Sequence, residues 1–284
     1  MRIRYIRDLR FVGHIQPCLF PDRQGFLFWI MEPAVFKAIF FLGCIAHCAA
    51  ALSSFLSVKT LAKSFVGLGF LLAGISCILR LVKWHPLLAL YQAPYFAVWA
   101  FAGICLFRPF AGDKERRLFF VILAALSLLA LFFPKDHYLP FLQTRTVFAF
   151  LFMLLGAGAR ACFFAAAGIA GAWLLSPEGE RPAMAAKKSW RKWTVWGFAL
   201  FTASMFSGEL WSYLGWGAPI VWEDPAVIAG MVVWFYYALF LHLDLLRFFE
   251  THRIAWAAVF GAVVAFVFAC LPDMGRLFPP TWMP

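Results

Sequence analysis

The sequence predicts an all-α polytopic membrane protein, with about eight transmembrane helices and an external tryptophan-rich loop between helices six and seven. The first observation is composition: 64% of the residues are hydrophobic, 14% are charged, and the mean hydropathy is +0.81. Soluble domains have roughly 45–50% apolar and 25% charged residues. The second is run length, because the apolar runs reach the ~20 residues that a membrane-spanning helix needs, whereas a strand needs only about 10. Both observations favour helices over a barrel.

Polar and proline-containing breaks divide the chain into successive apolar runs. The runs cover roughly residues 34–57, 64–83, 88–107, 118–134, 146–176, 194–212, 226–246 and 254–271. The fifth run is the longest, and its extra length allows tilt. We expect a basic tail over residues 1–33 that could lie on the membrane surface, a transmembrane domain over 34–272, and an external tail over 273–284. No apolar stretch with a small-residue cleavage site opens the chain, so we expect the N-terminus to be retained.

Lysine and arginine concentrate in alternate connections between these runs. Connections one, three, five and seven hold 13 of the 25 basic residues: Lys59 and Lys63; Arg108, Lys114, Arg116 and Arg117; Arg181, Lys187, Lys188, Arg191 and Lys192; Arg247 and Arg253. Cytoplasmic connections are enriched in these residues, which predicts that they face the inside of a bacterial cytoplasmic (inner) membrane. Five arginines in the N-terminal tail, Arg2, Arg4, Arg7, Arg10 and Arg23, argue against an outside N-terminus.

The segment "GELWSYLGWGAPIVWEDP", residues 208–225, contains no lysine or arginine, which predicts an external position. Its aromatic residues are Trp211, Tyr213, Trp216 and Trp222. Simple anchoring at the membrane interface is one explanation for them. The prolines, glycines and acidic residues of the segment favour a folded loop instead. Such a loop could present an aromatic shelf to a planar, hydrophobic ligand.

Cys44, His47 and Cys48 form the one cysteine cluster in the sequence. Helical packing explains it better than metal or thiol chemistry, because metal and redox sites normally have a diagnostic spacing that this cluster lacks. Phosphate-binding glycine loops, zinc-protease helices and nucleophile elbows do not occur convincingly. The sequence therefore predicts no independent catalytic centre.

Two stretches resemble a known family. "WGAPIVWEDPAVIAGMVVWFYYALFLH" is similar to the WWD segment and following helix of cytochrome c assembly proteins of the CcsA, ResC and HemX type, relatives of the CcmC and CcmF heme-handling proteins. With Asp224 and Pro225 on the family's aspartate and proline, Trp234, Tyr237 and His242 fall at the family spacing without a gap. "WHPLLALYQAPYFAVW" resembles the external segment before another family helix, and the whole resemblance spans roughly residues 34–272.

The resemblance implies that heme is the cofactor and that an external aromatic loop holds it. The implied heme-binding residues are Trp211, Trp216, Trp222, Asp224, Trp234, Tyr237 and His242. His242 is the implied iron ligand and lies about 24 Å along its helix, toward the inner side. A hydrogen bond to a neighbouring helix, or a position reaching the interface, is the structural alternative. The implied partners are the lipid bilayer, heme, and a cytochrome c assembly component or redox-complex subunit, with no nucleic acid.

Two departures from the family pattern keep other functions open. The external histidines expected as axial ligands are absent: "FLQTRTVF" supplies none near the fifth helix, and no histidine follows His252. His137 could be a displaced ligand or an ordinary loop histidine. The leading hypothesis is a protein that binds heme at the shelf and presents it to a partner, at most as part of a heme-attachment system. A noncatalytic subunit, regulator or anchor of a redox or heme-biosynthetic complex is the alternative, and a quinone site near His85 is a third.

Overall fold

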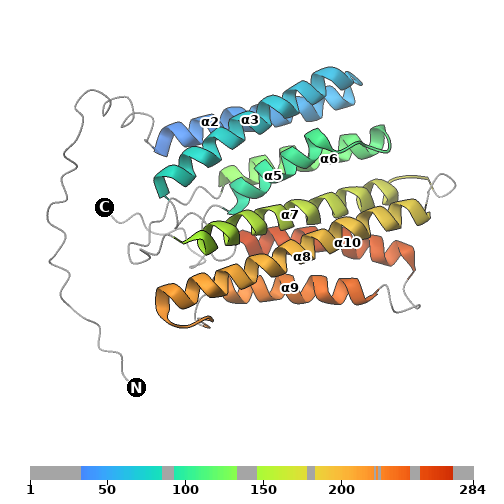
Figure 1. Ribbon diagram of the computed structural model, residues 1–284. Coiled ribbons are helices and arrows are strands. Elements are labelled where there is room, and N and C mark those ends of the chain that lie inside the picture. Colours follow the sequence, from blue (N-terminus) through green and yellow to red (C-terminus); the bar gives the residue numbers. More distant parts are fainter. Residues whose placement is uncertain are drawn as a thin grey trace, which may run out of the picture.

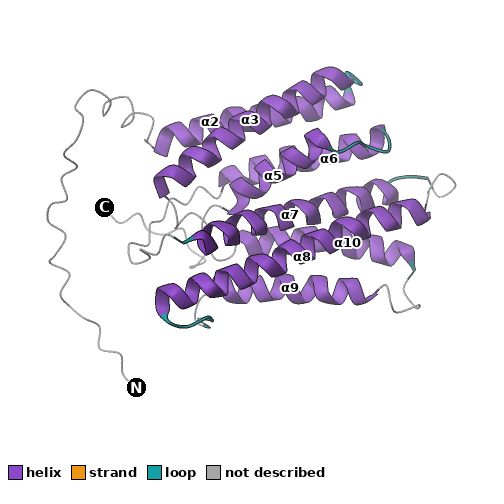
Figure 2. Cartoon of the chain, in the orientation of Figure 1, coloured by secondary structure: helices purple, strands orange, loops and turns teal. Residues whose placement is uncertain are grey.

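The computed structural model describes residues 33–84, 93–132, 146–177, 183–220, 222, 225–243 and 250–270. Every regular element within them is a helix (Figure 2), so the predicted all-α class is confirmed. The helices are α2 (Pro33–Phe55), α3 (Lys59–Trp84), α5 (Ala93–Phe107), α6 (Asp113–Phe132), α7 (Val147–Leu174), α8 (Ala183–Trp216), α9 (Pro225–Leu243) and α10 (Thr251–Cys270).

The helices run side by side along one long direction (Figure 1). Four of those described have stretches long and apolar enough to cross a membrane: Val35–Phe55, Lys59–Leu81, Val147–Leu174 and Thr251–Ala269. Helices α5 and α9 carry shorter apolar stretches, Pro94–Phe107 and Val227–Leu243. Large apolar side chains stay exposed on the outer faces, such as Leu71 on α3 and Phe235 on α9. These features match a polytopic helical protein whose outer surface contacts lipid.

Helix α7 occupies the centre and packs against α5, α6, α8 and α10. Its buried half is rich in alanine and glycine, which lets neighbouring helices approach closely. At Gly168 an added Cβ atom would lie 2.6 Å from the Phe119 ring of α6, and at Gly197 of α8 it would lie 2.6 Å from Phe163 of α7. Small residues at these positions therefore set the spacing of the core helices.

Several helices are longer than the apolar runs predict. Helix α8 spans Ala183–Trp216 instead of 194–212, and α3 and α6 begin at Lys59 and Asp113 instead of near 64 and 118. Lysine, arginine, glutamate and alanine are good helix formers, so the helices continue past the apolar runs. Asp113 and Glu115 also occupy the first turn of α6, where negative charge stabilises a helix.

Most of the lysines and arginines in the described part of the chain lie at one end of the bundle, whereas Lys37 and Arg80 lie toward the other end. The ends of α2, α5, α7 and α9 and the starts of α3, α6, α8 and α10 lie together at the basic end, at the right in Figure 1. The opposite end holds the α8–α9 corner. The alternation of charge along the sequence therefore corresponds to a separation of charge between the two ends of the fold.

Candidate functional site

The tryptophan-rich segment forms a corner between two helices. Its first half continues α8 as far as Trp216, four residues beyond the predicted end of the sixth apolar run at about 212, so the loop begins later than predicted. Gly217 has a φ of 73°, and its N–H donates to the Tyr213 carbonyl at 2.8 Å. The Ser212 hydroxyl donates to the Ala218 carbonyl at 2.8 Å. A left-handed glycine with such bonds is a common way to end a helix, so the turn begins at Gly217.

The tryptophans of this corner have different environments. Trp211 is 3% exposed and stacks on Phe152 of α7, with ring centroids 6.3 Å apart and an interplanar angle of 28°. Trp222 is 63% exposed, and Trp216 is the last residue of α8. Asp224 lies outside the described residues. Trp222 therefore presents an open aromatic surface at the corner, whereas Trp211 anchors α8 to α7.

Trp234 and Tyr237 connect α9 to the rest of the bundle. The Trp234 indole N–H donates to the Thr202 hydroxyl of α8 at 3.0 Å. Tyr237 is 1% exposed, and its ring stacks on Phe163 of α7 with centroids 3.5 Å apart and planes 6° apart. Among the residues described, the Tyr237 hydroxyl has no hydrogen-bond partner. Both side chains contact other helices of the bundle.

His242 lies one residue before the end of α9 and is exposed. Its Nδ1 is 2.7 Å from the Ala238 carbonyl oxygen of the same helix. A carbonyl oxygen only accepts, so Nδ1 carries the proton and, in the neutral ring, Nε2 keeps a lone pair. This intrahelical bond differs from the interhelical bond that a structural role predicts. His242 is about 26 Å along α9 from Pro225, and the other candidate ligand, His137, lies outside the described residues.

A buried histidine in α2 has more specific contacts than the sequence indicates. His47 is 1% exposed, and its Nδ1 lies 2.8 Å from the Ser127 hydroxyl oxygen of α6. That hydroxyl donates to the Leu123 carbonyl, so it accepts from His47 Nδ1–H. The His47 ring also packs against Gly69 of α3. The described residues contain no group of three metal-ligating side chains, and Cys44 is buried as packing predicts.

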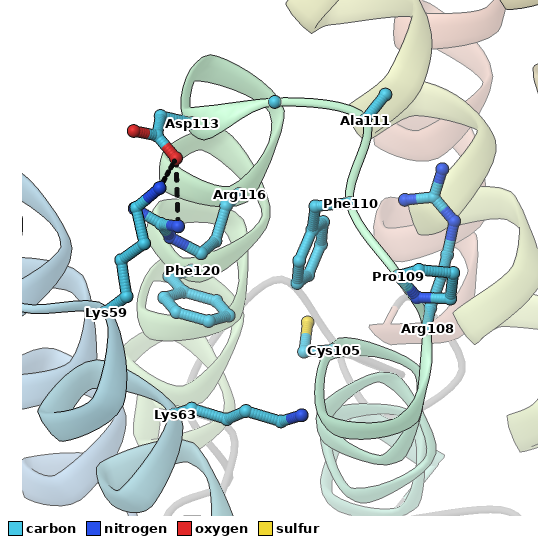
Figure 3. Close-up of a pocket in the computed structure, with 11 residues that line it drawn as sticks. Lys59, Lys63, Cys105, Arg108, Pro109, Phe110, Ala111, Asp113, Arg116 and Phe120 are labelled. Atoms are coloured by element: carbon cyan, nitrogen blue, oxygen red, sulfur yellow. Dashed lines mark ion pairs between the residues drawn. The ribbon is translucent and has the colours of Figure 1, made fainter.

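The basic end contains a charged pocket between α3, α5 and α6, which the distribution of lysine and arginine along the sequence does not predict. Asp113 Oδ1 lies 3.0 Å from both Lys59 Nζ and Arg116 Nη1 (Figure 3). The hydrogen bond from Lys59 lowers the pKa of the Asp113 carboxyl, with Arg116 contributing. Arg108 Nη2 pairs with Glu115 Oε1 at 2.6 Å, and Glu115 also accepts from the Ala111 N–H at 2.7 Å. These contacts fix the α5–α6 connection against the start of α3.

Comparison with known proteins gives the family. Residues 35–271 match the family model described as "Cytochrome C assembly protein". The chain is also similar to the cytochrome c biogenesis protein CcsA of Synechococcus sp. (strain RCC307), with 40% identity over 76 residues, which is 27% of this chain and 24% of the relative.

CcsA of Thermosynechococcus vestitus is 37% identical over 71 residues, covering 25% of this chain and 22% of the relative. CcsA of Prochlorococcus marinus (strain MIT 9312) is 32% identical over 71 residues, covering 25% of this chain and 23% of the relative. The chain thus spans about a quarter of the length of these curated relatives. The family match covers most of the chain and nearly all of its described helices. The chain belongs to the cytochrome c assembly protein family.

Proposed function

We propose that this protein handles heme during cytochrome c assembly in the bacterial cytoplasmic membrane. It binds heme at the α8–α9 corner, on the outer side, and presents it to a protein partner. The observation that carries the proposal is the corner itself, where Trp222 stays 63% exposed in a chain of this family. An exposed indole offers a flat face on which a planar macrocycle can stack.

The His242 ring supports a second contact with heme. Histidines that bind metals usually donate their other ring N–H to a carbonyl or carboxylate, which fixes the tautomer. The bond from His242 Nδ1 to Ala238 fulfils this condition and leaves Nε2 available to iron. Bound heme would supply the iron and the macrocycle, and the protein would supply the nitrogen ligand and the aromatic face. His242 and Trp222 flank opposite ends of α9, so they would serve two positions along the path of heme.

A noncatalytic CcsA-like membrane subunit is the alternative function. Two observations favour it: Trp211 and Tyr237 are used for helix packing, and the external histidines of the family pattern are absent from the sequence. In this case the fold would be retained as a regulator or anchor of a redox or heme-biosynthetic complex. Fold alone does not guarantee retained chemistry.

The two functions differ in heme content, which is measured on the purified protein by its absorption spectrum and a pyridine hemochrome assay. Under the leading proposal, Trp222→Ala should weaken heme binding roughly two- to tenfold, from ~0.5–1.5 kcal/mol per aromatic contact. Trp196→Ala is the matched control, because Trp196 is also exposed, at 58%, but lies far from the corner. Absence of heme from the wild-type protein would favour the subunit alternative.

His242 requires its own variants. His242→Ala and His242→Gln should both bind less heme, because neither side chain offers an imidazole nitrogen, and added imidazole should restore part of the signal in the alanine variant. His252→Ala is the control, since His252 is also exposed and lies at the start of α10. Normal heme content and cytochrome c yield in both His242 variants would remove His242 from the proposal.

The external position of the corner is tested by cysteine labelling. Pro219→Cys, in the exposed turn after α8, should react with a membrane-impermeant reagent in intact cells. Lys192→Cys, near the start of α8 at the basic end, should react after the membrane is opened. The reverse pattern would place the corner in the cytoplasm and contradict the proposed path of heme.

A further inference from the structure

The basic end of the bundle contains a cavity of about 430 Å³ between the start of α3, the end of α5 and the start of α6. Its wall includes Lys59, Lys63, Arg116 and Asp113, with Phe110 and Phe120 as apolar sides (Figure 3). The stretch of α3 that is long and apolar enough to cross a membrane begins at Lys59. The cavity therefore lies where a spanning helix reaches the membrane surface, at the depth of lipid headgroups.

The walls of the cavity are held in place by hydrogen bonds between helices. Arg117 of α6 donates through Nε to the Ser54 carbonyl at 3.1 Å and through Nη2 to the Ser57 hydroxyl at 3.2 Å. These bonds attach the α2–α3 turn to α6. The Lys59–Asp113 ion pair, at 3.0 Å, makes a second connection between α3 and α6. The lysines at the start of α3 are consequently presented on a fixed scaffold.

Positive charge in this cavity exceeds negative charge. Asp113 is shared between Lys59 and Arg116, and one carboxylate neutralises only one of these two cations. Arg116 Nε and Nη2 are buried and have no hydrogen-bond partner among the described residues. Lys63 has neither an ion-pair nor a hydrogen-bond partner there, and Figure 3 shows its ammonium extending across the cavity toward Cys105. The arrangement can accept an additional anion.

A second cavity, of about 470 Å³, lies beside the same two lysines. Its other lining residues are Thr60, Ser64, Gly67 and Leu106. From there an exposed apolar surface continues, with Leu68 of α3 at 49% exposure and Phe107 of α5 at 77%. Lysines and hydroxyls next to a lipid-facing apolar surface suit a molecule that joins a phosphate to hydrocarbon chains. A free phosphate would use the charged part alone.

We propose that the pocket formed by Lys59, Lys63 and Arg116 binds the phosphate group of an anionic phospholipid, whose acyl chains lie along α3 and the end of α5. The site lies at the opposite end of the bundle from the α8–α9 corner, and none of its lining residues belongs to α9. Bound lipid would bridge α3 and the α5–α6 connection. Its phosphate group would supply a second negative charge beside Lys59 and Arg116, which now share the single carboxylate of Asp113.

The test uses the purified full-length protein in detergent, titrated with phosphatidylglycerol or phosphatidylcholine, with bound lipid counted by native mass spectrometry. Lys63→Met should weaken phosphatidylglycerol binding about fivefold, the effect expected for one basic residue near anionic lipid. Asp113→Asn should strengthen it, because Lys59 and Arg116 lose their competing carboxylate. Lys192→Met is the control with the same charge loss on an exposed residue of α8.

Three results would count against the proposal. Equal losses in Lys63→Met and Lys192→Met would indicate a diffuse basic surface and overturn the site. Weaker binding in Asp113→Asn would contradict the competition between carboxylate and phosphate. If glycerol phosphate competes at equal concentration, with the same dependence on Lys63, phosphate recognition is upheld and the lipid source is overturned. Lys59→Met provides a second loss variant if Lys63→Met fails to fold.

Discussion

The effect of Tyr237→Phe on the free energy of unfolding tests whether Tyr237 is a packing residue or a heme contact. The side chain is 1% exposed and stacks on Phe163, and its hydroxyl has no partner within the described residues. Leaving a buried hydroxyl without a partner costs about 1–3 kcal/mol. Tyr237→Phe keeps the stacked ring and removes the hydroxyl. We therefore expect the free energy of unfolding to rise by about 1 kcal/mol, with heme content unchanged.

Trp234→Phe is the comparison variant with the opposite expected sign. It loses the indole N–H that donates to Thr202 at 3.0 Å, and such bonds average ~0.6 kcal/mol in membrane proteins. Both variants are unfolded with sodium dodecyl sulfate in mixed micelles, and helix content is followed by circular dichroism. A Tyr237→Phe protein less stable than wild type by more than ~1 kcal/mol would show that the hydroxyl has a partner, and refute the reasoning. A Tyr237→Phe protein that loses heme at unchanged stability would indicate that the Tyr237 hydroxyl contacts heme.

Two further predictions concern helix packing and pH. Gly69→Ala should destabilise the fold by about 1–3 kcal/mol, because its methyl group would overlap the His47 ring. Gly67→Ala should be neutral or stabilising in the same unfolding assay, because the nearest atom to its added methyl group is 3.9 Å away. The Asp113 carboxyl has a lowered pKa, so its stabilising contact is present above the unfolded pKa of about 3.9 and is lost as the pH falls further. Lys59→Met should make thermal stability depend less on pH in this acid range, because it removes the main cause of the lowered pKa. Melting curves with the same pH dependence as the wild-type protein would contradict this prediction.

Apolar run length was sufficient to predict the class and approximate order of the helices. It was a poor guide to where helices end, because hydropathy detects the lipid-facing part of a helix and not its continuation into the headgroup zone. Helix α8 shows this clearly: "AMAAKKSWRKW" is too polar to read as membrane-embedded, yet it consists largely of helix formers. At the other end, Gly217 is the residue that stops the helix, and its positive φ explains why a glycine is suitable there.

The site was less predictable, because sequence spacing does not determine which way an aromatic side chain points. Trp211 and Trp222 belong to the same segment, but one stacks on α7 and the other is exposed. The charged pocket was missed for a related reason. Lys59 and Asp113 are far apart in the sequence, and each has an ordinary explanation alone, as a cytoplasmic lysine and as a helix-start acid.

The separation between the two ends of α9 decides how the proposed heme contacts relate to each other. Pro225 and His242 are 17 residues apart, which is about 26 Å of helix. In this structure, one heme therefore cannot stack on Trp222 while its iron is bound by the Nε2 of His242. Effects of substitutions at sites this far apart normally add within ≈ 0.3–0.5 kcal/mol. Trp222→Ala and His242→Ala should therefore lower heme affinity independently, each acting at its own position. A coupling energy well above that value would contradict the view that the two residues act at separate heme positions.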